Sequence, residues 1–249
     1  VVVRCDDGRV VRSSHAVLAI GSVPNTDGLG LALESAMKTH LTELDAIARD
    51  PASPDFQNTI AALERSGRAL DRAATIYGIY SATMSDATVQ KVERDIEPKL
   101  AAHRDRITQN TKLFARIAKV YEARDKSGLN DEQRRLVWLT YTNFVRSGAQ
   151  LDAASKKKLA DINQQLAGLY TRFNQNLLAD EGERYTLLET EADLAGLPES
   201  VRAGAAAGAE GRGFKGKWLI ANTRSSVEPF LTYSTRRDLR EKIWRTFVD

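Results

Sequence analysis

Apolar residues follow two different patterns along the chain, and the first is confined to about thirty residues. Short apolar runs at Val1–Val3 and Val10–Val11 flank Asp6-Asp7-Gly8-Arg9, and an Asp-Gly pair suits the tight turn of a β-hairpin. The continuous apolar run Ala16–Ile20, stopped by Gly21, is typical of a strand buried on both faces. The chain therefore begins with a predicted β segment.

From about Leu31 the apolar spacing changes to three and four residues, which predicts helices. The longest such stretch predicts one helical face, with Pro98 as its only interruption and a kink or a new helix start near Glu97. Ser85 or Asp86 is the expected N-cap. The face consists of Val89, Val92, Ile96, Leu100, His103, Ile107, Asn110, Phe114, Ile117 and Tyr121.

Three further helices are predicted from a capping residue followed by an apolar stripe. Their expected N-caps are Asn58, then Asn130 or Asp131, then Asp152. We interpret the stripes as packing faces: Ile60, Leu63, Leu70 and Tyr77 in the first, Leu136, Val137, Leu139, Tyr141 and Phe144 in the second, and Leu159, Ile162, Leu166, Leu169, Phe173 and Leu177 in the third.

Beyond Asp180 the periodicity weakens. Residues 185–188 and 217–220 have the composition of short strands, glycines punctuate an Ala-rich helix and a loop between them, and 235–247 is again amphipathic. The whole pattern predicts a mainly α fold with a short N-terminal β segment.

Composition narrows the classes of partner. The chain has 249 residues, 42% hydrophobic and 28% charged, and a net charge of +3 without a dense Lys/Arg stripe, so we expect no nucleic acid. No run reaches the roughly 18 apolar residues of a membrane span, and the start lacks the order of a signal peptide. With the single cysteine Cys5, this predicts a cytoplasmic protein and no membrane partner.

The chain offers no complete set of catalytic groups. Its three histidines, His15, His40 and His103, are far apart, and none belongs to the HExxH pattern that places two imidazoles and a base beside one zinc ion. A dispersed three-histidine site stays open as an alternative to surface or packing histidines. Cys5 lacks an evident base, and Gly28-Leu29-Gly30 lacks the third glycine of a dinucleotide loop.

Turns and solvation explain the remaining acidic and glycine motifs. The pairs Asp6-Asp7 and Glu181/Glu183 fall in predicted turns, where exposed carboxylates are ordinary, and Gly211-Arg212-Gly213 is predicted to be a turn. We therefore predict no catalytic, no cofactor-binding and no metal-binding residue in this chain.

Residues 15–31 resemble a segment of the flavin-dependent pyridine nucleotide-disulfide oxidoreductases. The resemblance rests on His15–Thr26 and on Gly28-Leu29-Gly30-Leu31. In that family the segment closes the nicotinamide-nucleotide domain, which agrees with a buried strand. The glycine-rich loops, the redox cysteine pair and the dimerisation domain of the family are absent from the sequence.

From residue 32 onward the chain resembles the N-terminal region of the thimet-oligopeptidase family of zinc metallopeptidases, and within it the bacterial dipeptidyl carboxypeptidases. Several separated segments carry the resemblance in the order of the family: Phe56–Gly67, Pro98–His103, Leu113–Ile117, Asn163–Ala167 and Arg237–Arg240. The division implied is 1–31 as an oxidoreductase-like β fragment and 32–249 as the helical oligopeptidase-like region.

This resemblance implies a multi-helix domain that forms one wall of a channel for oligopeptides, with the HExxH zinc helix on the other wall. Because Asp249 precedes the place of that helix, we expect a truncated chain that binds no zinc and hydrolyses no peptide alone. The partners expected are oligopeptides, through the channel of the full-length protein. A fusion of reading frames or a mistaken start site is the favoured origin of the junction near residues 30–32.

Two alternatives remain open at this point. The helical region could bind peptides without cleaving them. Less strongly supported is a fragment of an NAD(P)/FAD-dependent oxidoreductase, which rests on the first thirty residues alone.

Overall fold

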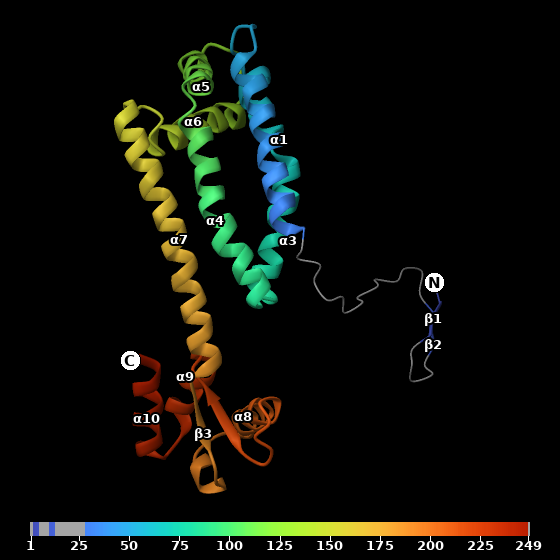
Figure 1. Cartoon of the computed structure of the whole chain (residues 1–249), viewed down its shortest axis with the longest axis vertical. Coiled ribbons are helices and arrows are strands. Elements are labelled where there is room, and N and C mark those ends of the chain that lie inside the picture. The colour runs from blue at the N-terminus through green and yellow to red at the C-terminus, as the bar shows by residue number, and fades with distance from the viewer. Residues whose placement is uncertain (1, 5–9, 13–27, 249) are drawn as a thin grey trace. The chain divides into compact units, whose positions relative to one another are not determined.

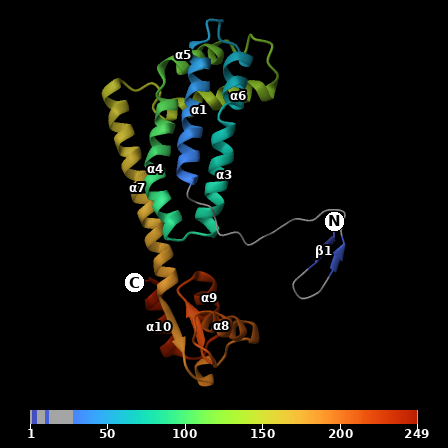
Figure 2. The same cartoon turned by 45° about the vertical axis from the view of Figure 1, so that its right-hand side comes forward.

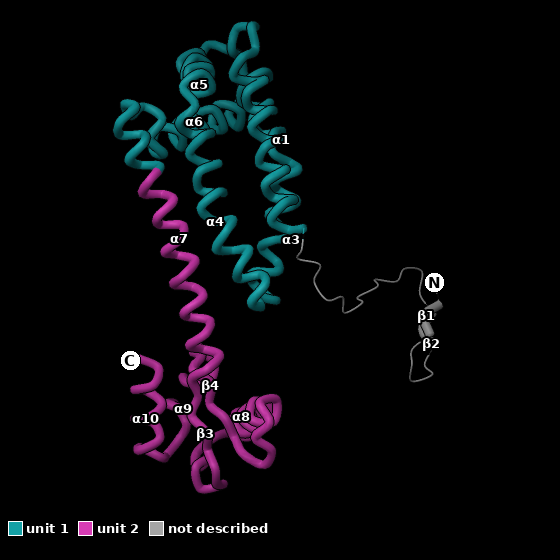
Figure 3. Tube along the Cα trace, in the orientation of Figure 1, with its two compact units in different colours: residues 1–160 teal, residues 161–249 magenta. Residues whose placement is uncertain are grey.

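The computed structural model of the chain describes residues 2–4, 10–12 and 28–248, with side chains for 28–248 (Figure 1). Helices dominate the described residues, which confirms the mainly α prediction. The chain divides into two compact units, unit 1 (Val1–Ala160) and unit 2 (Asp161–Asp249), which Figure 3 colours teal and magenta.

The two N-terminal strands are confirmed as an antiparallel pair. Strand β1 (Val2–Arg4) pairs antiparallel with β2 (Val10–Arg12), with Val3 opposite Val11. The predicted turn at residues 6–9, Cys5, His15 and the predicted strand Ala16–Ile20 lie outside the described residues.

Unit 1 is helical from residue 28 onward. Helix α1 (Leu29–Arg49) lies beside α3 and α4, as the views in Figures 1 and 2 agree. Helix α1 includes residues 31 and 32, between which the division of the chain was predicted, and that division stays a prediction. The elements after α1 are the π-helix η1 (Phe56–Ala61), α2 (Ala62–Arg65), α3 (Arg68–Thr83), α4 (Ala87–Thr108), α5 (Thr111–Ala123), α6 (Asp131–Arg146) and the start of α7 (Ala153–Glu183).

Three N-caps are confirmed and one is corrected. The Asp152 side chain accepts a hydrogen bond from the Ser155 amide at the start of α7. The side chains of Asp86 and Asn130 accept hydrogen bonds from first-turn amides of α4 and α6. Asn58 is not the cap of its helix: Asp55 is, and Asn58 occupies the third position of a reciprocal capping box, where its oxygen accepts from the Asp55 amide. The predicted stripe Ile60–Tyr77 is also divided over η1, α2 and α3, because Gly67 breaks the helix with φ of 78°.

The long predicted face breaks at Asn110, and of the kink or new helix start predicted near Glu97, the new start does not occur. Helix α4 continues through Pro98 to Thr108. The Asn110 side chain, predicted to belong to the apolar face, instead accepts hydrogen bonds from the amides of Lys112 and Leu113 and starts α5. A side chain that caps a new helix thus ended the regular spacing, while a proline inside the helix did not.

Unit 1 has two apolar clusters that share α1. Leu29, Leu33 and Met37 of α1 pack with side chains of α3 and α4, including Tyr77 and Ile96. About two turns further on, Leu44 joins a second cluster with η1, α5 and α6. The members of the second cluster are Leu44, Ile60, Leu113, Ile117, Val120, Val137, Phe144 and Ala149.

Unit 2 combines helices with a two-stranded sheet. Strand β3 (Tyr185–Leu188) pairs antiparallel with β4 (Trp218–Ala221), close to both predicted strands. Around the pair lie the 3₁₀-helix η2 (Glu191–Leu194), α8 (Glu199–Gly211), α9 (Arg224–Tyr233) and α10 (Arg237–Val248). Its core consists of Leu188, Leu194, Leu197, Ala205, Ile220, Val227, Phe230 and Ile243.

Two predicted packing faces differ from the structure. In α6, Leu139 is exposed, although Val137 and Phe144 are buried. In α7, the stripe predicted to pack is largely exposed, from 41% at Leu166 to 65% at Phe173, and only Leu159 is half-buried. Helical spacing identifies a common face but does not identify what covers it.

Candidate functional site

A groove of about 630 Å³ lies between α1 and α4 in unit 1. Met37, Leu41 and Ala102 give it apolar surface. Charged and polar side chains also line it: Glu34, Lys38, Thr42 and Asp45 from α1, and Lys99, His103 and Arg106 from α4.

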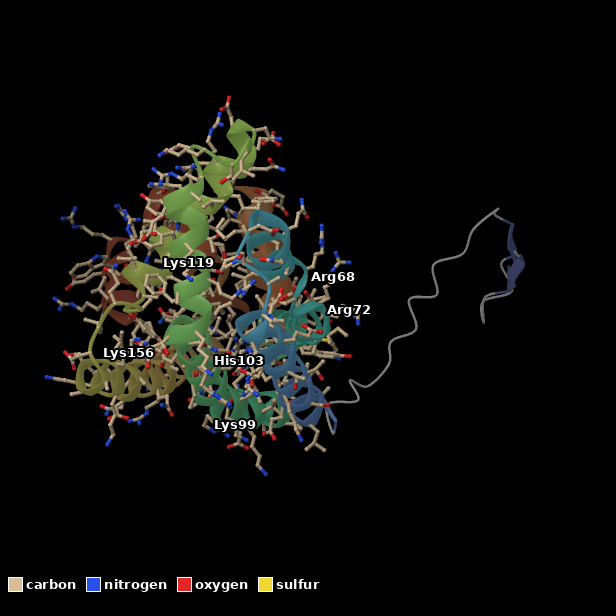
Figure 4. All side chains as sticks on the ribbon, turned by 90° about the horizontal axis from the view of Figure 1, so that it is seen from above. Arg68, Arg72, Lys99, His103, Lys119 and Lys156 are labelled. Carbon is tan, nitrogen blue, oxygen red and sulfur yellow. The ribbon has the colours of Figure 1, made fainter. Side chains whose placement is uncertain are left out.

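The charges along this groove are partly paired. Lys99 forms an ion pair with Glu34 across the two helices, and Asp45 pairs with Arg49 on α1. Figure 4 labels Lys99 and His103, which lie four residues apart on α4. Mixed charge over an apolar surface suits a ligand with both polar and apolar parts, such as a peptide segment.

Two histidines that are 63 residues apart in the sequence meet beside this groove. Nδ1 of His40 on α1 lies 3.1 Å from Nε2 of His103 on α4, and their ring centroids are 5.1 Å apart. His103 is only 5% exposed. Both histidines thus pack between helices, which is one of the two roles predicted for them, although the sequence did not indicate that their rings meet.

The joint between α2 and α3 closes over the other side of the His40 ring. Nε2 of His40 lies 3.2 Å from Ser66 Oγ, and the Gly67 amide donates to Glu43 Oε2 at 2.7 Å. A Cβ on Gly67 would stand 2.9 Å from His40 Cε1. The joint thus needs glycine both for its backbone angle and for its approach to the ring.

Burial favours the neutral form of both imidazoles. Desolvation lowers the pKa of His40, partly offset by the carboxylates of Glu43 and Asp71. Desolvation, followed by the nearby His40, Arg106 and Arg104, lowers the pKa of His103 to about 4.

The described residues do not fit a zinc site. Among residues 28–248 no group of three or more His, Cys, Asp or Glu side chains could hold a metal ion, and the His40–His103 pair has no third such ligand there. The open three-histidine alternative would need His15, which lies outside the described residues.

Structural roles account for the weak motifs that the structure describes. Gly28 precedes α1, and a Cβ on Gly30 would stand 4.0 Å from Val92, so Gly30 lies at a helix contact. Glu181 and Glu183 were predicted in a turn, and this is wrong: both lie in the last turns of α7. Asp6 and Asp7 lie outside the described residues.

Sequence reasoning missed a structural arginine. Arg116 of α5 is 7% exposed and donates to the carbonyls of Asp50 and Ala52 at 2.7 and 3.0 Å and to Asn58 Oδ1 at 2.9 Å. Its guanidinium therefore fixes the Pro51–Pro54 turn that follows α1. The available signal was a lone Arg on the apolar face of an amphipathic helix, beside Ile117.

The remaining grooves and charged side chains offer fewer candidate functional groups. Unit 2 has a groove of about 440 Å³ lined by Leu231, Arg237, Arg240, Glu241 and Trp244 and another of about 260 Å³ beside β4, α8 and α9. Labelled cations of unit 1 come from several elements, with Arg68 and Arg72 on α3, Lys119 on α5 and Lys156 on α7 (Figure 4). Within the described part of the chain, no helix has the length and apolarity to cross a membrane.

Most of the chain is similar to bacterial dipeptidyl carboxypeptidases. It is 36% identical to the dipeptidyl carboxypeptidase of Escherichia coli and 33% identical to that of Salmonella typhimurium, in each case over 86% of this chain and 31% of the relative. The chain thus spans about a third of the length of these relatives. No family model matches it.

A short match points to a different protein. Over 31 residues, 12% of this chain, the identity to the NAD(P)H dehydrogenase (quinone) of Mycobacterium tuberculosis is 64%, and the match covers 6% of that relative. Its length equals that of the predicted segment 1–31.

Proposed function

We propose that residues 32–249 are the helical, substrate-channel region of a zinc metallopeptidase of the thimet-oligopeptidase family, a dipeptidyl carboxypeptidase that hydrolyses oligopeptides. The observation that carries this proposal is the identity of 33–36% over 86% of the chain to two proteins of that name. The mainly α fold is consistent with it. The proposal includes residence in the cytoplasm, with which a single cysteine is compatible.

In this proposal the chain supplies a channel wall and no catalytic group. The 249 residues contain no HExxH pattern, and the described ones contain no cluster of three metal-binding side chains. A bound zinc ion would activate water for attack on a peptide carbonyl in the whole enzyme. We therefore assign this chain the binding and orientation of peptides and no proton transfer or metal ligation.

A chimeric enzyme tests the proposal. In the Escherichia coli dipeptidyl carboxypeptidase, the stretch that matches this chain is replaced by residues 32–249. We expect the chimera to cleave oligopeptides and to lose this activity to a chelator. The matched control carries a Gln in place of the glutamate of the HExxH helix and should be inactive. A folded chimera with stoichiometric zinc but no hydrolysis would contradict the proposal.

The isolated 249-residue chain provides a second test. We expect less than stoichiometric zinc by elemental analysis and no chelator-sensitive hydrolysis, because three zinc-binding side chains do not converge in its described part. Tightly held zinc at one ion per chain, removed by His40→Gln or His103→Gln, would overturn the assignment of both residues.

A second candidate function is peptide binding without cleavage. The groove between α1 and α4 favours it, because apolar and charged side chains line the same surface. Titration calorimetry with a mixed oligopeptide pool should give saturable heat, which Lys38→Glu and Arg106→Glu, at exposed positions of the groove, should together weaken. The oxidoreductase alternative rests on the 31-residue match, and flavin absorbance in the purified protein would revive it.

A further inference from the structure

The hydrogen bonds around His40 and His103 run in one direction. The hydroxyl of Ser66 has a single proton, and it donates this proton to the Leu63 carbonyl at 2.7 Å. Ser66 Oγ can then only accept from His40, so the proton of His40 lies on Nε2 and its Nδ1 is an acceptor. His103 must in turn donate from Nε2 to that acceptor.

This placement of the protons leaves the lone pair of one imidazole nitrogen without a hydrogen bond. With its proton on Nε2, His103 has a bare Nδ1, and that atom is buried without a hydrogen-bond partner among the described residues. An unpaired acceptor costs less than an unpaired donor with a charge, so the neutral pair tolerates this arrangement.

Proton uptake disrupts the arrangement by either route. A proton on Nδ1 of His103 creates a buried cationic N–H without an acceptor, on the helix that also carries Arg104 and Arg106. A proton on Nδ1 of His40, which Glu43 and Asp71 favour, brings two N–H groups face to face. His103 could then restore the bond only by moving its own proton to Nδ1. Both routes place an unsatisfied donor at the same buried atom.

We propose that the His40–His103 pair is an acid-sensitive clasp, which holds α1, α4 and the Ser66–Gly67 joint together while both imidazoles are neutral and opens when the pair takes up a proton. His103 also lines the groove between α1 and α4, along with Lys38, Lys99 and Arg106. Opening of the clasp therefore loosens one wall of that groove. The clasp does not depend on the peptidase assignment.

Imidazole nitrogen NMR of the 249-residue chain tests the proton order directly. At pH 7.5 we expect both His40 and His103 as the Nε2–H form, with assignments made from the single variants His40→Gln and His103→Gln. His103 should stay neutral at pH values where an ordinary histidine is charged. A proton on Nδ1 of His103 at pH 7.5 would overturn the proposal.

Hydrogen exchange tests the opening. Between pH 7.5 and pH 5, after correction for the intrinsic rates, amides of α1 near His40 and at the Ser66–Gly67 joint should lose at least tenfold in protection. Glutamine cannot take up a proton, yet its amide can still donate and accept a hydrogen bond. The His103→Gln variant should therefore lose this pH dependence, and the control His15→Gln should retain it.

A further variant keeps the test decisive if the glutamine variants are unstable. Ser66→Ala removes the acceptor of His40 Nε2–H and leaves both imidazoles in place. It should release the tautomer of His40, which appears as a mixed nitrogen signature at pH 7.5, and raise exchange at that pH. Unchanged tautomers in Ser66→Ala, or an equal acid response in His103→Gln, would refute the clasp.

Discussion

Unit 1 and unit 2 bury their apolar residues in different ways. In unit 1, one long helix, α1, contributes to two clusters, and its partners are further amphipathic helices. In unit 2, a single cluster gathers side chains from two four-residue strands, a 3₁₀-turn and three helices. The difference shows when core residues can be predicted from the sequence. Regular apolar spacing over many helical turns identifies them, whereas strands and turns of four residues are too short to show such spacing.

The two units also differ in their polar interiors. Unit 1 buries Arg116 and His103, and each connects segments that are distant in the sequence. In unit 2 the ion pairs of Arg236 with Asp193 and Asp238 are partly exposed. All three histidines fall within the residue range of unit 1. We therefore expect unit 1 to respond to acid at a higher pH than unit 2.

Core truncation should give the largest effects and should separate the units. Phe230→Ala in unit 2 and Ile117→Ala in unit 1 remove fully buried side chains, and each should reduce the free energy of unfolding by about 3–4 kcal/mol. Hydrogen exchange during urea denaturation should show faster opening of the altered unit only. The matched controls Tyr233→Ala and Ile79→Ala, at exposed positions, should change little. Equal acceleration in both units would mean that they unfold together.

Loss of the Arg116 guanidinium should be nearly as costly. Arg116→Ala removes the guanidinium donor from two backbone carbonyls and from Asn58 Oδ1, which keeps the Asp55 amide, and we expect a loss of about 3 kcal/mol with faster exchange at residues 50–58. Arg49→Ala is the control, because that side chain is exposed and its ion pair is worth well under about 1 kcal/mol. A similar midpoint for both variants would remove the assigned role of Arg116.

Acid should weaken unit 1 first. The pKa of His103 is lowered from 6.5 to about 4, so the unfolded chain takes up the proton first, and stability is lost as the pH falls from about 6.5 to about 4. We expect a loss on the order of 2 kcal/mol in unit 1 over this window. Exchange measured in each unit between pH 7 and pH 4 checks it, and His103→Gln should abolish most of the change.

Unit 2 should respond only at lower pH. Hydrogen bonds from Arg236 lower the pKa of Asp238 to about 2, and the Thr190 amide lowers that of Asp193. Their contribution is present above about pH 3.8 and is lost as the pH falls further. Loss of unit 2 before unit 1 between pH 6.5 and pH 4 would reverse the comparison.

Glycine substitutions should give the smallest effects and distinguish close packing from backbone strain. Gly67→Ala meets a left-handed backbone and the His40 ring, which two hydrogen bonds hold in place, so we expect a loss of about 2 kcal/mol. Gly213→Ala in unit 2 has a similar φ of 83° but open space, and should cost about 1 kcal/mol. Thermal denaturation of the two variants measures the difference. Equal losses would mean that the His40 ring yields easily.

Local chemistry in the sequence was enough to locate many elements. The caps at Asp86 and Asn130, the hairpin of β1 and β2 and the strands β3 and β4 were all predicted, because a cap or a strand pair depends on residues close by in the chain. The prediction from the sequence failed where two local signals at one residue favoured different structures. Asn110 lay in register with an apolar face but acts as a cap, and Pro98 lay inside a helix that continues.

The candidate site was largely invisible in the sequence. His103 lay on an apolar helical face, which indicated burial, but nothing nearby indicated His40 as its partner. Arg116 likewise binds carbonyls more than sixty residues earlier. The sequence by itself determined that the chain is helical and where most helices begin, since those depend on side chains within a few turns. Only the tertiary structure decided which buried polar groups meet and which apolar stripes stay exposed. Contacts between segments that are distant in the sequence produce no regular residue spacing from which they could be predicted.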